Sequence, residues 1–172
     1  MNDFHALSLL GVSSEQLTAS IKQLSSLPHI GEQRIRLVVD PTRITQAAQL
    51  VEKGSLPAVI VAVAGYPTGR HHTLIKASEA RLAVESGAEE VWVSVDDTIE
   101  DSNTILSELI TLNEACPDPV KLGLIAPENN SAAQTAATYA ARQAGFAFIV
   151  AREVTEAIEK AADGLPLHIV DL

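Results

Sequence analysis

The sequence predicts an α/β fold, a shortened TIM-type (β/α) barrel with about seven parallel strands. One observation is a repeated pattern in which an amphipathic helix reaches a glycine and leads into a nearly continuous apolar run. A second is that these runs are apolar at successive positions, which is typical of parallel strands covered by helices. The third is the length of 172 residues, which suits one domain over residues 1–172, whereas a full eight-stranded barrel takes about 250.

Seven short segments are the predicted strands. The run at 58–64 is apolar at every position, and only the segment at 4–10 is weakly patterned. In chain order the predicted strands are residues 4–10, 35–39, 58–64, 91–95, 121–126, 146–150 and 167–170.

Six amphipathic segments between them are the predicted helices. The first places Leu17, Ile21 and Leu24 on one face, and Asp40 followed by Pro41 is typical of the start of the second. The helices after the first are predicted at 42–53, 73–86, 99–113, 131–144 and 153–162. Four of these helices are followed by a glycine, which adopts a positive φ at little cost: Gly54, Gly87, Gly145 and Gly164.

Strict alternation of strands and helices is also compatible with an open, doubly wound sheet. Such sheets usually carry a glycine fingerprint after the first strand, and residues 11–14 (Gly-Val-Ser-Ser) do not match it. The barrel interpretation leaves the chain short by about one strand–helix unit. We therefore expect the first and seventh strands to meet directly, or a second copy of the chain to cover the gap between them.

Composition excludes several classes of function. There are 12 Lys and Arg residues against 22 Asp and Glu, giving a formal charge of −10, and aromatic residues make up 3%. This balance argues against nucleic-acid binding, which depends on clustered cations and stacking platforms. No apolar run is long enough to span a bilayer and no secretory signal is visible, so we expect a cytoplasmic protein. The single cysteine, Cys116, excludes an internal disulfide and is a poor candidate for a nucleophile.

Polar residues gather where the predicted strands end, which is where ligands bind in both architectures. The loop Gly-Tyr-Pro-Thr-Gly-Arg-His-His at 65–72 lets the backbone approach a ligand, and Arg70 is suited to hold an anion. The alternative is a simple turn with solvated histidines. The candidate ligand-binding residues are Asp40, Arg43, Gly65, Tyr66, Gly69, Arg70, His71, Asp96, Glu128 and Arg152.

Other kinds of site find little support. His71 and His72 beside Asp96 and Asp97 resemble a metal-ligand set, but adjacent residues point in different directions and no metal-binding spacing occurs, so we expect no metal and no cofactor. The two aspartates are better explained as the start of the next helix. No Gly-x-Ser-x-Gly elbow of a hydrolase is present. The five lysines, none of which falls at the carboxyl end of a strand, are Lys22, Lys53, Lys76, Lys121 and Lys160.

Residues 61–96 closely resemble the deoxyribose-phosphate aldolases, class I aldolases on a (β/α)₈ barrel. Residues 37–51, 121–130 and 144–153 resemble the second, fifth and sixth strands of that family. The family's glycine-aromatic-proline turn and the helix after it are matched by Gly65, Tyr66, Pro67, Gly69, Lys76, Glu79, Ala80 and Arg81.

The resemblance implies cleavage of 2-deoxyribose 5-phosphate through a lysine imine, without metal or cofactor. The family's imine-forming lysine falls on Val150 and its proton-transferring aspartate on Trp92. Its seventh-strand lysine would fall within 167–171, which contains none, its first-strand aspartate falls near Ala6, and its phosphate-binding segment would lie beyond the last residue. An indole N–H donates but does not act as an acid or base near neutral pH.

We therefore expect a pseudoenzyme-like relative that lacks aldolase chemistry and serves as a small-molecule-binding protein or a partner subunit. Such a protein can form a homo-oligomer. The alternatives are a lyase that acts on a sugar phosphate with rearranged residues, such as Asp96, His71 and His72, and a purely structural interaction protein.

Overall fold

The computed structural model describes residues 4–28 and 33–172 and confirms the predicted class: seven parallel strands form a curled half-barrel with helices on its outside. The strands are β1 (Ala6–Leu9), β2 (Ile35–Val39), β3 (Ala58–Ala64), β4 (Glu90–Ser94), β5 (Lys121–Ile125), β6 (Phe148–Ala151) and β7 (Leu167–Ile169). The helices are α1 (Ser14–Ser26), α2 (Ile44–Gly54) preceded by the 3₁₀ turn η1 (Pro41–Arg43), α3 (Thr73–Glu85), α4 (Ser102–Ala115), α5 (Ser131–Gln143) and α6 (Glu156–Ala162).

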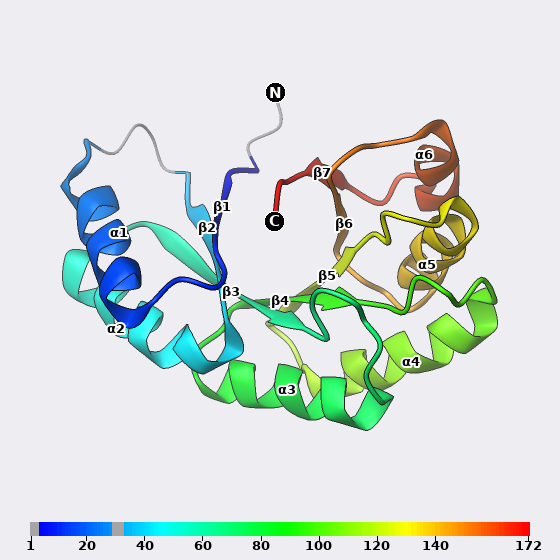
Figure 1. Cartoon of the computed structure of the whole chain (residues 1–172), viewed down its shortest axis with the longest axis horizontal. Helices are drawn as coiled ribbons and strands as arrows, with labels where there is room; N and C mark the ends of the chain where they lie inside the picture. The colour runs from blue at the N-terminus through cyan, green and yellow to red at the C-terminus, as the bar shows by residue number, and fades with distance from the viewer. Residues whose placement is uncertain (1–3, 29–32) are drawn as a thin grey trace.

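Each strand pairs with the strand that follows it in the chain, so the sheet order is β1-β2-β3-β4-β5-β6-β7. All six ladders are parallel; Val63, for example, lies opposite Trp92, which lies opposite Gly123. The helices pack on the convex face of the sheet, and the concave face opens between β1 and β7 (Figure 1). This arrangement places all carboxyl ends of the strands at one rim.

The concave face is filled by apolar side chains. Trp92 is fully buried there and its ring meets the edge of Phe148, with 6.1 Å between ring centroids. Gly123 makes room for Phe148, because a Cβ at Gly123 would lie 2.2 Å from the phenyl ring. The other buried members of this cluster are Val38, Val59, Val61, Val63, Val150 and Val170. The interior is therefore packed rather than open.

Two helix boundaries differ from the sequence prediction. Gly54 was predicted to follow α2 directly, but it is the last residue of the helix. The left-handed residue after the helix is Ser55, with φ 48°. A Cβ at Gly54 would lie 2.4 Å from the Ser25 hydroxyl, so this glycine allows α1 and α2 to pack closely. Helix α4 begins after Asp101, whose side chain accepts a hydrogen bond from Thr104 N, and not at the Asp96–Asp97 pair.

The two edges of the sheet approach each other through side chains. Within the described residues β1 and β7 form no ladder, so the expected direct pairing is wrong, whereas cover by a second copy stays a prediction. Instead the ring of Phe4, just before β1, stacks on His168 of β7 with 3.6 Å between centroids. The guanidinium of Arg36 lies 3.9 Å from the centre of the same ring. We call the Phe4–His168 contact the seam.

The burial of His168 at the seam should make the stability of the protein depend on pH. Burial, and then the charge of Arg36, lower the pKa of His168 below its ordinary value. The unfolded chain therefore takes up a proton first as the pH falls through about 6.5, and stability declines over that range. We expect the melting temperature to fall more between pH 7.5 and 5.5 in the native protein than in His168→Phe, which keeps the stack. Equal slopes in thermal unfolding would contradict this.

Candidate functional site

A cavity of about 350 Å³ opens at the carboxyl ends of β3, β4, β5 and β6. Its polar groups come from four successive strand–helix connections, because parallel strands deliver their ends to one rim. Its walls are Tyr66, Pro67, Thr68, Arg70, Ser94, Val95, Asp97, Ile125, Ala126, Pro127, Glu128, Asn129 and Arg152. Tyr66, Arg70, Glu128 and Arg152 were predicted as candidate binding residues, and the structure brings these four together.

The turn after β3 is held rigidly over this cavity. Gly65 N donates to the Glu79 carboxylate at 2.8 Å, and Gly69 N donates to Gly65 O at 2.7 Å. Gly69 has φ +67°, and a Cβ there would lie 2.1 Å from the carbonyl carbon of Val95. The two predicted glycines therefore shape the turn and lie against β4 and α3; their contribution to the site is backbone geometry.

The side chain of Lys76 also supports the turn after β3. This side chain on α3 is 1% exposed, and its ammonium donates to Gly69 O at 2.9 Å and Ser94 O at 3.2 Å and pairs with Glu108 of α4. Sequence reasoning placed Lys76 within a helix and missed this role. Its partners are largely backbone carbonyls that the topology brings together, so no local pattern could have indicated them.

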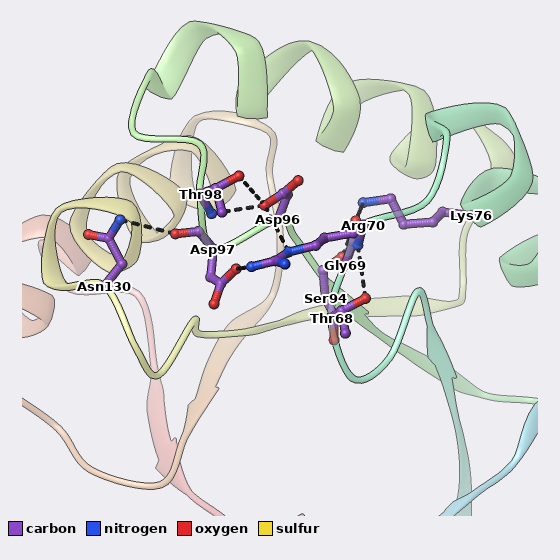
Figure 2. A network of polar contacts seen from close by, with 9 residues as sticks. All are labelled: Thr68, Gly69, Arg70, Lys76, Ser94, Asp96, Asp97, Thr98 and Asn130. Carbon is purple, nitrogen blue, oxygen red and sulfur yellow. Dashed lines mark hydrogen bonds and ion pairs between the residues drawn. The ribbon is translucent and has the colours of Figure 1, made fainter.

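A polar network joins the turn to the loop after β4 (Figure 2). Arg70 Nη2 lies 2.6 Å from Asp97 Oδ1, and Arg70 Nε lies 3.5 Å from Asp96 Oδ1. Asp96 also accepts from the Thr98 hydroxyl and backbone N–H, at 2.6 and 2.8 Å. The Thr98 hydroxyl above all, then its N–H and the charges of Arg70 and Lys76, lower the pKa of Asp96. Asp96 thus stays ionised near neutral pH and neutralises Arg70.

A second arginine on the opposite wall is also paired. Arg152 Nε lies 3.2 Å from Glu128 and 3.2 Å from Asp171, and Arg152 Nη2 donates to Leu172 O at 2.8 Å. Both arginines of the cavity are therefore occupied by carboxylates. With Asp96 and Asp171 included, carboxylates outnumber arginines, so this rim does not favour an anion without rearrangement.

Six of the ten predicted residues are not among the cavity walls. Gly65, Gly69 and Asp96 belong to the turn and the polar network described above, and the other three lie apart from them. Asp40 accepts a hydrogen bond from Gly11 N at 2.8 Å, which ties the turn after β1 to the end of β2, and it makes no side-chain cap to η1. Arg43 lies in η1. His71 is exposed in the loop just before α3. Sequence position alone could not separate them from the residues that face the cavity.

The two residues onto which the resemblance carries the catalytic lysine and aspartate, Val150 and Trp92, both lie on the concave face. Val150 is 1% exposed within the apolar cluster, and Trp92 donates its indole N–H to Glu90 at 3.2 Å, toward the amino ends of the strands. Ser94, two residues after Trp92, does line the cavity; its hydroxyl is buried and has no hydrogen-bond partner among the described residues. Sequence reasoning did not select Ser94.

Metal and thiol chemistry find no support within residues 4–28 and 33–172. No three His, Cys, Asp or Glu side chains there come together in a way that could hold a metal ion. Burial raises the pKa of Cys116 to about 11, so its thiolate is scarce near neutral pH. None of the helices in that part of the chain has the length and apolar character needed to cross a membrane.

Asn130 links the site to helix stability. Its side chain accepts from Ala132 N and Ala133 N at the start of α5 and donates to Asp97 O at 3.0 Å. We expect Asn130→Ala to lower the free energy of unfolding by about 1–2 kcal/mol, because the helix loses its N-cap. Asn129→Ala, at an exposed neighbour, is the control in urea denaturation; similar losses in both would refute the assignment.

Comparison with known proteins identifies relatives of this chain. The sequence is 46% identical over 69 residues to a deoxyribose-phosphate aldolase from Corynebacterium jeikeium and, over the same length, 46% identical to one from Corynebacterium glutamicum. The matched segment covers 38% of this chain and 28% and 31% of those two proteins. No protein-family model matches the sequence.

Solved structures agree on the fold. The aldolase QR15 superposes with a TM-score of 0.75 at 20% identity, over 95% of this chain and 77% of that one. The sequence identity is concentrated in a part of the chain, while the fold likeness extends over nearly all of it. This chain, whose matched segment spans less than a third of the length of the two Corynebacterium relatives, is similar to deoxyribose-phosphate aldolases in sequence over part of its length and in fold over nearly all of it.

Proposed function

We propose that this chain is a non-aldolase member of the deoxyribose-phosphate aldolase family. It binds a small, uncharged, hydroxyl-rich molecule in the carboxyl-end cavity without forming an imine. The observation that carries the proposal is the position of the lysines. None of the residues that line the cavity is a lysine, and the family's nucleophile position is the buried Val150. An imine needs a primary amine beside the bound carbonyl.

Lys76 is the lysine nearest the cavity walls, and its ammonium is unsuited to nucleophilic attack. It already donates to two backbone carbonyls and pairs with Glu108. To attack a carbonyl, the amine would have to lose one proton and direct the exposed lone pair at the ligand. At least one of the three partners would then lose its donor, which is costly around a side chain that is 1% exposed.

The class of ligand follows from the polar groups on the walls. Arg70 and Arg152 are each paired, so the cavity offers alternating donors and acceptors with no unpaired cation on its walls. Ser94 adds a buried hydroxyl that lacks a partner among the described residues. Hydroxyl groups both donate and accept, so a polyol can satisfy such a surface without breaking the ion pairs. A lyase that uses Asp96, His71 and His72 has less support, because both histidines are exposed and outside the walls.

Borohydride trapping tests the absence of imine chemistry. The protein is incubated with 2-deoxyribose 5-phosphate and sodium borohydride, and its mass is measured. We expect no adduct, whereas the C. glutamicum aldolase, treated in parallel, serves as the reference for labelling. An adduct on any lysine would overturn the proposal.

Binding is tested separately by thermal shift with 2-deoxyribose and with inorganic phosphate. We expect the melting temperature to rise with 2-deoxyribose, since a ligand that binds the folded state stabilises it, and we expect phosphate to cause no shift that depends on Ser94. Ser94→Ala should lose most of the shift while unfolding at the same temperature without ligand. A shift that Ser94→Ala retains would place the ligand elsewhere.

A further inference from the structure

A second cavity, of about 360 Å³, lies at the opposite end of the half-barrel, beside the amino ends of β2, β5, β6 and β7. It shares Arg36 and Lys121 with an adjoining cavity of about 500 Å³. Four of its wall residues are apolar (Phe4, Ala147, Phe148 and Pro166) and three are basic (Arg36, Lys121 and His168). It therefore combines flat apolar walls with cations, and it is separate from the carboxyl-end cavity.

The basic groups retain capacity to bind. Arg36 contacts both oxygens of Glu90 through Nε, at 3.0 and 3.1 Å, and its two Nη groups have no protein acceptor within the described residues. The Lys121 ammonium also lacks a partner there, and it is exposed. His168 Nδ1 is buried and without a hydrogen bond in that same part of the chain. A guanidinium with free Nη groups is suited to carboxylate or phosphate.

The local charge differs in sign from that of the other rim. In the two adjoining cavities Arg34, Arg36 and Lys121 face Glu89 and Glu90, so cations are in excess. The protein as a whole carries −10, and at the carboxyl-end rim carboxylates are in excess. An anion that approaches this molecule is therefore favoured at the amino ends of the strands.

We propose that the amino-end cavity binds a small organic anion, with its carboxylate or phosphate on Arg36 and Lys121 and its apolar body against Phe148 and Pro166. Carboxylate and phosphate groups are both recognised by charge-assisted hydrogen bonds from guanidinium and ammonium groups. The flat apolar part distinguishes this site from a surface that attracts any small ion.

Titration with benzoate, phenyl phosphate and the neutral benzyl alcohol tests the proposal. The chain has one tryptophan, Trp92, which lies against Phe148 and stacks with Phe4 at 5.9 Å between centroids, so its fluorescence reports on the cavity. We expect both anions to bind and to bind more tightly than inorganic phosphate, because of the aromatic body. Benzyl alcohol should bind at least about tenfold more weakly, since it lacks the charge-assisted hydrogen bonds.

Matched variants locate the site. Lys121→Met should weaken benzoate binding roughly tenfold. Lys22→Met, which changes another exposed lysine, on α1, should leave it unchanged. Both variants should unfold at the native temperature, because neither lysine is buried. Calorimetry with 2-deoxyribose present should give the same benzoate affinity, as the two cavities are distinct. Equal binding of benzyl alcohol, unchanged binding in Lys121→Met, or competition by 2-deoxyribose would each overturn the proposal.

Discussion

Replacing Lys76 by methionine is expected to lower the free energy of unfolding by about 3–5 kcal/mol, because it breaks a buried ion pair from one side. Methionine retains the apolar length of the side chain, so the loss reports on the ammonium. Without it, the carbonyls of Gly69 and Ser94 lose their donor, and Glu108, whose side chain is 17% exposed, loses its counter-ion. Urea denaturation at neutral pH measures the difference.

The same helix supplies a matched control. Arg81 pairs with Glu85 at 3.1 Å, but these side chains are 65% and 58% exposed. Arg81→Met should therefore change the free energy of unfolding by about 0.5 kcal/mol or less. If Lys76→Met cost no more than Arg81→Met, Lys76 would not be the support of the turn that we describe.

Gly69→Ala is expected to have a comparable effect for a different reason. The added Cβ would lie 2.1 Å from the carbonyl carbon of Val95, the residue that directly follows β4, and Gly69 has φ +67°. Strain in the left-handed conformation and the forced displacement of the backbone at the end of β4 should together cost about 3–5 kcal/mol. Thermal and urea unfolding measure this cost, and the 2-deoxyribose shift should disappear because the turn borders the cavity.

Gly11→Ala separates the cost of the left-handed conformation from the cost of the steric contact. Gly11 has φ +70°, yet a Cβ added there would have no neighbouring atom within 4 Å among the described residues. Only the conformational strain remains at this position, so we expect a loss of about 1–2 kcal/mol. Equal losses at Gly11 and Gly69 would show that the contact with Val95 is relieved at no cost.

The strands and helices were largely predictable because their signals are local. The run at 58–64 became β3 with the predicted bounds, since seven successive apolar residues suit a strand covered on both faces. The start of α4 was not predicted correctly, because Asp96 and Asp97 are as suited to a helix start as Asp101 is. Only the three-dimensional position of Arg70 decides that Asp96 and Asp97 serve the loop.

The site was predictable only in part. The rule that ligands bind at the carboxyl ends of strands selected the right rim, and with it Tyr66, Arg70, Glu128 and Arg152. The pairing of both arginines with carboxylates comes from neighbouring connections and could not be deduced from spacing. At the other end, a charged residue within an apolar strand, Arg36, was a signal that the sequence analysis did not use.

The linear strand order also bears on how the chain folds. Every ladder joins consecutive strands, so each step closes only the loop around one helix, and such local contacts favour rapid folding. The contact between Phe4 and His168 spans nearly the whole polypeptide and is costly in loop entropy until the rest is in place. The formation of this contact is thus a late event, and weakening it should accelerate unfolding while the folding rate hardly changes.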